Sequence, residues 1–227
     1  MPGPVASDGD LVGETLACRR GGRLVFAGLD FSLPAGSALV LTGSNGSGKS
    51  SLLRLLAMLL TPAAGRLLWE GRPVAADPAR YRAALGYAGH LDAIKPALTA
   101  RETLRFWAAL RGAANPTANP AIETALDRFG LGMVADWPCR FLSAGQRRRL
   151  ALARLVAAPA SVWLLDEPTA ALDSDGETRL IEAIAGHRAE GGRVAVATHL
   201  PLALPAALTI RLDDHATAPD DALAALW

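Results

Sequence analysis

One short segment of the chain has the residue types and spacing of a phosphate-binding loop. Gly43-Ser44-Asn45-Gly46-Ser47-Gly48-Lys49-Ser50 lies between an apolar run and a leucine-rich segment and matches G-x-x-x-x-G-K-[ST]. Glycines let the backbone curl so that its N–H groups point at phosphate oxygens, and the following helix adds the positive end of its dipole. Lys49 supplies a charge for the β and γ phosphates, and the Ser50 hydroxyl can ligate Mg²⁺. The segment predicts a nucleoside triphosphate site.

Two acidic residues stand at the end of a second apolar run. Ser161 to Leu165 has the length of a buried strand and leads directly into Asp166 and Glu167. A P-loop enzyme needs a carboxylate for its metal ion and a group that activates water. We expect Asp166 to hold Mg²⁺ and Glu167 to polarise the attacking water. Taken alone, this pattern also fits a strand followed by a solvated turn.

Three further motifs follow in order along the chain. Leu142-Ser143-Ala144-Gly145-Gln146 opens a helical pattern, Ala171-Leu172-Asp173 follows the acidic pair, and Thr198-His199 follows a third apolar run. Ser143 and Gln146 alone have the spacing of a helix capping box, which is a purely structural explanation. The whole order of motifs, however, resembles the ATP-binding cassette (ABC) ATPase family over about residues 12–212.

The resemblance implies an ATPase that binds ATP and Mg²⁺. ATP would contact residues 43–51, including Ser51 beyond the motif. Arg20 stands about where an aromatic residue normally stacks on adenine, and its planar guanidinium could stack instead. Ser50 and Asp166 would hold Mg²⁺. His90, in the place of a Gln that normally senses the metal, is a further candidate ligand.

The same resemblance implies that two copies of the chain form each site. Leu142–Gln146 would be the signature loop, with Ser143 and Gly145 capping the γ-phosphate of ATP bound to the other copy; Ala144 replaces the usual Gly there. Glu167 would be the catalytic base, and His199 would contact the γ-phosphate. Asp173 would lie at the seam of the homodimer.

A narrower resemblance concerns ATP-binding subunits of haem exporters in c-type cytochrome biogenesis. It rests on Cys18-Arg19-Arg20, Gly89-His90, Ile94-Lys95, Leu98-Thr99, Leu142 to Leu155 and Thr198 to Leu202. It implies an ATPase that powers haem export or delivery. The chain would lie peripherally on the cytoplasmic face of the bacterial inner membrane, with integral membrane subunits of a cytochrome c maturation complex docked beside residues 90–110.

No direct haem site is predicted. His187 and His215 lack a Cys-x-x-Cys-His or similar context, and we expect both on the surface. Cys18 and Cys139 stand apart without metal-ligand spacing, so we expect buried, reduced thiols.

Two alternatives share the ATPase chemistry. One is an ABC ATPase for another transported substrate, and the other is a soluble ABC ATPase that acts on nucleic acid or the ribosome. The chain has no inserted coiled coil and no second cassette, and its net charge is only +1. Arg147-Arg148-Arg149 would span three faces of a helix, which favours a solvated cap over a nucleic-acid surface. We therefore expect no nucleic-acid partner.

The elements that must position these motifs form an α/β pattern. We predict a P-loop NTPase core with a mixed β-sheet and an inserted helical subdomain. A flexible N-terminus (1–11) precedes a single domain, with its core at 12–92 and 158–212 and the helical subdomain at 93–157; a C-terminal tail (213–227) follows. Helix signals include Ser50 to Leu60, a Thr99/Glu102 capping box and an Asn119-Pro120 start.

Only two of the 23 basic residues are lysines, Lys49 and Lys95. A compact ammonium fits a phosphate nest that is too tight for a guanidinium fork. We therefore expect Lys49→Arg to lose ATP hydrolysis although it keeps the charge, whereas Lys95→Arg retains it. Steady-state release of phosphate by the two purified variants measures the difference. Near-normal turnover by Lys49→Arg would show that charge alone suffices.

Overall fold

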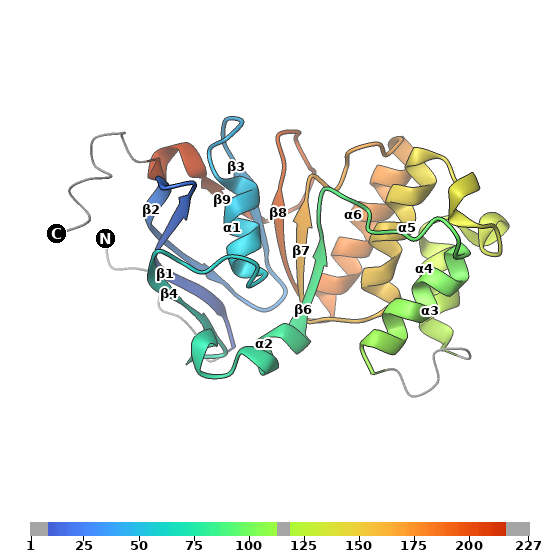
Figure 1. The fold of residues 1–227 in the computed structure, drawn as a ribbon, viewed down its shortest axis with the longest axis horizontal. Coiled ribbons are helices and arrows are strands. Elements are labelled where there is room, and N and C mark those ends of the chain that lie inside the picture. Colours follow the sequence, from blue (N-terminus) through green and yellow to red (C-terminus); the bar gives the residue numbers. More distant parts are fainter. Residues whose placement is uncertain (1–8, 113–118, 217–227) are drawn as a thin grey trace.

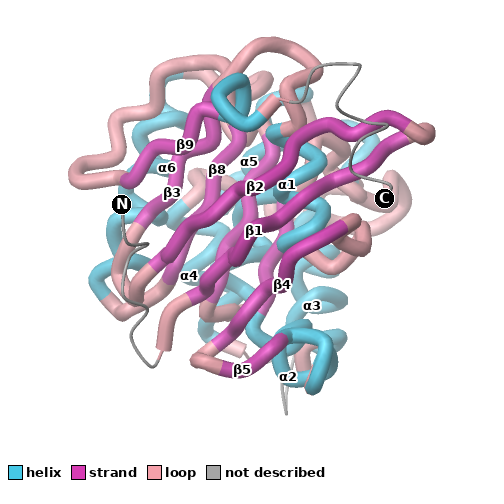
Figure 2. Tube along the Cα trace, turned by 90° about the vertical axis from the view of Figure 1, so that its left-hand side faces the viewer, coloured by secondary structure: helices cyan, strands magenta, loops and turns pink. Residues whose placement is uncertain are grey.

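The computed structural model of the chain describes residues 9–112 and 119–216. Their strands form two sheets on either side of helix α1 (Lys49–Leu56; Figure 1). The strands are β1 (Leu11–Arg20), β2 (Arg23–Leu33), β3 (Ala38–Thr42), β4 (Ala64–Trp69), β5 (Arg72–Pro73), β6 (Leu85–Ala88), β7 (Val162–Asp166), β8 (Arg193–Ala197) and β9 (Leu208–Arg211). An antiparallel sheet has the order β2-β1-β4-β5 and faces the viewer in Figure 2, and a parallel sheet has the order β6-β7-β8-β3-β9.

Helices cover both faces of the parallel sheet. The α-helices are α1 (Lys49–Leu56), α2 (Pro78–Ala84), α3 (Ala100–Leu110), α4 (Pro120–Arg128), α5 (Ala144–Ala157) and α6 (Ser174–Ala189). Short 3₁₀ helices are η1 (Val74–Ala76), η2 (Gly132–Val134), η3 (Cys139–Phe141) and η4 (Leu212–His215). Helices α3 to α5 lie together on the side away from the antiparallel sheet (Figure 1).

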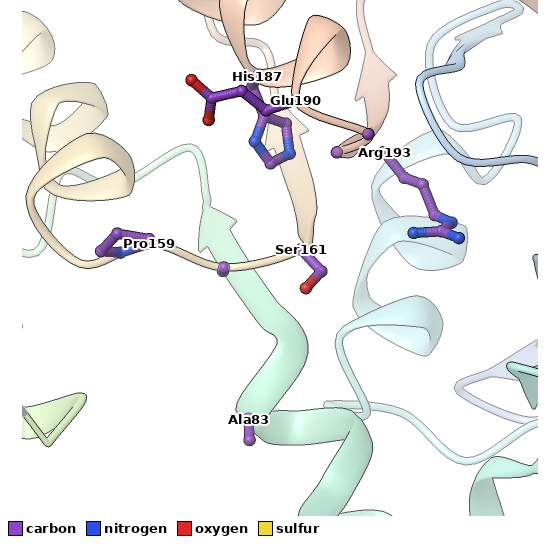
Figure 3. A pocket seen from close by; sticks show the side chains of 9 residues that line it. Ala83, Pro159, Ser161, His187, Glu190 and Arg193 are labelled. Atoms are coloured by element: carbon purple, nitrogen blue, oxygen red, sulfur yellow. The ribbon is translucent and has the colours of Figure 1, made fainter. Parts of the chain in front are cut away.

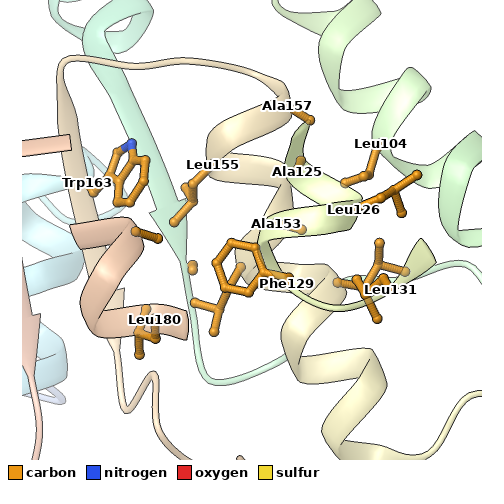
Figure 4. Close-up of a cluster of buried hydrophobic side chains, with 14 of the residues drawn as sticks. Leu104, Ala125, Leu126, Phe129, Leu131, Ala153, Leu155, Ala157, Trp163 and Leu180 are labelled. Carbon is orange, nitrogen blue, oxygen red and sulfur yellow. The ribbon is translucent and has the colours of Figure 1, made fainter. Parts of the chain in front are cut away.

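Two hydrophobic cores lie on opposite faces of the parallel sheet, because side chains alternate along each strand. On β3, Leu39 and Leu41 pack with α1 and the antiparallel sheet. Ala38 and Val40 belong to the other core, which includes α3 to α6 and is shown in part in Figure 4. Trp163 of β7 and Phe129, just after α4, join the helical side to the sheet. The helical part thereby shares one continuous core with the sheet that carries the P-loop.

The predicted α/β class with a P-loop core is confirmed, although the parallel and antiparallel strands belong to two sheets. Both capping boxes form, at Thr99 and at Ser143, and Asn119 caps α4 with Pro120 at its first position. The helix expected at Ser50 to Leu60 is wrong at its end. It stops at Leu56, because Met58 adopts a left-handed φ of 57°.

The helices α3 to α5 fall within the range expected for the helical subdomain. β1 begins at Leu11, and packed chain continues past residue 212 through η4. The rest of the expected N-terminal and C-terminal segments, 1–8 and 217–227, lies outside the described residues. Cys18 and Cys139 are both buried, as expected, and burial raises the pKa of each thiol.

The expectation that His187 lies free on the surface is wrong. Its ring stacks on Trp163, with ring centroids 4.0 Å apart and an interplanar angle of 4°. It lines a cavity of about 370 Å³ with Glu190 and Arg193 (Figure 3). This cavity lies where β7 and β8 begin, at the edge opposite the P-loop. Burial lowers the pKa of His187 below its usual 6.5.

This lowered pKa predicts how stability depends on pH. The unfolded chain binds a proton at His187 near pH 6.5, whereas the folded chain does so only at lower pH, so the free energy of unfolding falls as the pH drops below about 6.5. His187→Phe keeps an aromatic ring against Trp163 but cannot take up that proton. We expect urea unfolding to show a smaller loss of stability between pH 7 and pH 5.5 in this variant. Parallel pH profiles for variant and wild type would contradict the assignment.

Candidate active site

The carboxyl ends of the parallel strands meet at one edge of their sheet, and the residues with chemical potential follow them directly. In the register, Leu41 of β3 pairs with Ala197 of β8, which also pairs with Asp166 of β7, so these strand ends are level. The P-loop follows β3, Asp166 ends β7 with Glu167 directly after it, and His199 lies two residues beyond β8. Open α/β sheets bind ligands at this edge.

The P-loop turns tightly into α1. Gly48 has a φ of 109°, and a Cβ there would lie 2.8 Å from the Val25 side chain, so only glycine fits. Lys49 is 7% exposed, and its Nζ donates to the carbonyl oxygens of Gly43 at 2.8 Å and Ser44 at 3.0 Å. The ammonium is therefore held inside the curl of the loop.

A cavity of about 380 Å³ opens beside the P-loop. Arg20, at the end of β1, is one of the residues that line this cavity. The antiparallel sheet therefore contributes a guanidinium to the predicted nucleotide site. His90 is exposed just beyond β6 and is not among the residues that line the cavity. The residues that line the cavity are Arg20, Val25, Asn45, Gly46, Gly48, Lys49, Ser50, Ser51, Arg54 and Glu167.

Ser50 and Asp166 meet at the floor of the site. The Ser50 hydroxyl donates to Asp166 Oδ1 at 2.8 Å, and Asp166 is only 2% exposed. Hydroxyl and carboxylate oxygens are the hard donors that Mg²⁺ takes up together with phosphate oxygens and water. The described residues hold no cluster of three or more His, Cys, Asp or Glu suited to a metal. The Ser50 hydroxyl and the Asp166 carboxylate are oxygen donors of the kind that fits Mg²⁺.

Glu167 contacts His199 across the edge of the sheet. His199 Nδ1 lies 2.8 Å from Glu167 Oε2, and the His199 backbone N–H points at the same oxygen at 3.4 Å. The Glu167 backbone is left-handed, with a φ of 47°, which is uncommon for a residue other than glycine. A strained residue of this kind at a ligand cavity is a candidate catalytic group.

The signature segment lies outside this cavity. Ser143 and Ala144 are exposed at the start of α5, and none of the described residues that line the cavity comes from Leu142–Gln146. Asp173 caps α6 by accepting from the backbone N–H of Gly176 at 2.9 Å, so its carboxylate has a structural role in this chain. The structure therefore brings Arg20, the P-loop, Asp166, Glu167 and His199 together, but not the signature segment.

The expected solvated cap at Arg147-Arg148-Arg149 is wrong. Arg148 is 3% exposed and donates to the main-chain oxygens of both members of the acidic pair, Asp166 and Glu167. Arg149 donates to the carbonyl of Phe129 at 3.4 Å. The sequence held a signal for Arg148, because it shares a helical stripe with Leu152 and Leu155, which are buried.

Asp213 is a second residue that the sequence did not indicate. It lies in η4, beyond β9, and its Oδ1 accepts from the Ser44 hydroxyl at 2.7 Å. Both carboxylate oxygens also accept from the Ser44 backbone N–H at 3.1 Å. These hydrogen bonds hold the pKa of Asp213 below its usual range. The carboxylate ties the first turn of the P-loop to the last part of the described fold.

Residues 26–170 match the family model described as ABC transporter. The chain is 53% identical over 214 residues to a cytochrome c biogenesis ATP-binding export protein, CcmA, of Paramagnetospirillum magneticum, covering 94% of this chain and 99% of the relative. It is 55% identical to the CcmA of Rhodospirillum rubrum, covering 92% and 88%. An ABC transporter ATP-binding protein of Pyrococcus furiosus has the same fold, with a TM-score of 0.80 at 21% identity, covering 92% and 100%.

Proposed function

The chain belongs to the ABC transporter family of ATPases, and on this premise we propose that it powers haem export or delivery in c-type cytochrome biogenesis. The observation that carries the transport assignment is identity of 53% over nearly the full length of an export protein of cytochrome c biogenesis. The catalytic assignment is supported by the contact of Glu167 with His199 at the mouth of the P-loop cavity.

In the proposed reaction, the backbone of residues 43–51 binds the phosphates of ATP, and Lys49 pairs with the β and γ phosphates. Arg20 stacks on the adenine from the wall of the cavity. Ser50 and Asp166 hold Mg²⁺, with His90 as a further candidate ligand. When bound, Mg²⁺ neutralises charge that develops on the phosphates.

Glu167 accepts a proton from the attacking water in this proposal. In this proposal His199 donates a hydrogen bond from Nδ1 to the Glu167 carboxylate, at the observed 2.8 Å, which points the carboxylate in one direction. Both ring nitrogens of a protonated imidazole are donors, and in this form Nε2 donates to the γ-phosphate while Nδ1 donates to Glu167. His199 therefore both orients the base and contacts the substrate.

Each site is completed by a second copy of the chain. Ser143 and Gly145 cap the γ-phosphate bound to the opposite copy, and Asp173 lies at the seam. Support for this arrangement comes from the exposure of Ser143 at the N-terminus of α5, outside the chain's own cavity, where the positive end of the helix dipole favours an anion.

The membrane subunits dock beside residues 90–110. Three large apolar side chains are exposed there: Leu91 is 80% exposed, Phe106 44% and Leu110 65%. Exposed apolar groups of this size favour a partner surface over water. Within the described residues, no helix is both long and apolar enough to cross a bilayer. We propose that the chain is a peripheral subunit on the cytoplasmic face of the inner membrane and that it binds no haem itself.

Glu167→Gln tests the catalytic part of this proposal. The amide cannot accept the proton, so we expect hydrolysis to fall by about a hundredfold or more while ATP binding is retained. Glu190→Gln, an exposed residue at the far edge of the sheet, is the matched control and should turn over normally. Turnover by Glu167→Gln near the wild-type rate would show that Glu167 is not the base.

The same variant tests the physiological part. In cells that lack the gene, haem-stained c-type cytochromes should disappear, and the wild-type chain should restore them while Glu167→Gln should not. Undiminished c-type cytochromes in the deletion strain would remove the haem assignment and leave the ATPase intact, in favour of another transported substrate. Stimulation of the ATPase by DNA or ribosomes, without membrane subunits in a pull-down, would favour the non-transport alternative.

A further inference from the structure

Arg148 is a buried cation whose hydrogen bonds go almost entirely to the main chain. A guanidinium has five N–H donors in a rigid plane, and five contacts account for them here. Nε donates to Pro168 O at 3.2 Å, Nη1 to Gly89 O at 2.8 Å and Asp92 Oδ1 at 3.3 Å, and Nη2 to Asp166 O at 3.0 Å and Glu167 O at 2.7 Å.

These contacts fix the position of the guanidinium. An uncompensated buried charge is costly, so each donor must keep its acceptor. Asp92 is the only carboxylate among the five acceptors, and its side chain is 28% exposed. The remaining acceptors are carbonyl oxygens, whose positions depend on the backbone of two separate segments. Lysine could not reproduce this planar arrangement, because its ammonium has three donors directed from one point.

The first of these segments holds the proposed base. Glu167 has a left-handed backbone, which costs free energy unless the surroundings impose it. Its N–H donates to Ala197 O at 2.8 Å, and its carbonyl accepts from Arg148 at 2.7 Å. The strained residue is therefore held at both ends of its own backbone. This restraint sets the direction in which the Glu167 side chain leaves the sheet, toward His199.

The second segment is the loop after β6. Arg148 binds Gly89 and Asp92, which flank the exposed residues His90 and Leu91. Arg154, further along α5, donates to the carbonyls of Tyr87 at 2.7 Å and Asp92 at 3.3 Å, so the loop is held at several points. Only Arg148 joins this loop to the carbonyls of residues 166–168 among the described hydrogen bonds.

We propose that Arg148 is a positioning residue that fixes the backbone of Glu167 for catalysis and ties it to the loop at residues 89–92. If the loop at residues 89–92 moves, the Gly89 and Asp92 acceptors of the Arg148 guanidinium move with it. The same guanidinium donates to the Glu167 carbonyl, so the Glu167 backbone is affected as well. The hydrolytic rate therefore responds to contacts made at the loop, without any change in the P-loop. This inference rests on the proposed role of Glu167 as the base.

The test separates kcat from KM for ATP in the full-length chain. Arg148→Lys keeps the charge but loses the planar fork, so we expect kcat to fall by about tenfold to a hundredfold while KM for ATP stays within about twofold. A variant that merely loosened the fold would change both parameters or lower the fraction of active protein. Arg188→Gln is the matched control, because Arg188 also joins two distant carbonyls, of Gly36 at 3.0 Å and Pro205 at 2.9 Å, and should keep its kcat.

Asp92→Asn gives a second route if Arg148→Lys does not fold. It removes the one ionic partner of Arg148 from a partly exposed position, and we expect a smaller fall in kcat, of about threefold to tenfold, again with unchanged KM. Wild-type kcat in folded Arg148→Lys, or in Asp92→Asn if the first variant is unfolded, overturns the proposal. If Glu167→Gln is inactive and Arg148→Lys is fully active, only the positioning role fails. If Glu167→Gln is active, the role of Glu167 and this inference fail together.

Discussion

Parallel pairing of β6, β7, β8, β3 and β9 is the constraint on which the rest of the structure depends. Parallel strands end at the same edge, so segments far apart in the sequence are brought together there without long loops. The P-loop, Asp166 and His199 become neighbours in this way. The two cores on either face of the sheet keep the strand ends level, because the alternating side chains of β3 belong to both. Packing and catalysis therefore share one scaffold.

Main-chain carbonyls at this edge are held by cations, and one carboxylate holds the main-chain N–H and hydroxyl of Ser44. Lys49 binds the carbonyls of Gly43 and Ser44, and Arg148 binds those around Glu167. Asp213 accepts from Ser44 on the other side of the P-loop. Irregular backbone leaves polar groups outside any ladder, and each must find a partner when it is buried. The tight P-loop and the left-handed backbone of Glu167 are stable because Lys49, Asp213 and Arg148 supply these partners.

Local signals with a physical mechanism were readable from the sequence. The glycine pattern of the P-loop, the capping boxes at Thr99 and Ser143, and the strand that ends in Asp166 all depend on residues close in the chain. The burial of Arg148 had a signal in the helical stripe that it shares with Leu152 and Leu155, but the partners of Arg148 and Asp213 were not readable, because they lie in distant segments and are mostly backbone groups. His187 was misjudged for a related reason, since its burial depends on Trp163 of another element.

Within one chain, Ser143 and Gly145 lie outside the cavity that holds Glu167, so each proposed site takes its signature residues from a second copy. The most direct test is the specific ATPase activity across a dilution series in which light scattering reports the molar mass. Activity per chain is predicted to fall together with the fraction of dimer as the protein is diluted. Undiminished activity per chain at concentrations where the protein is wholly monomeric would contradict the account.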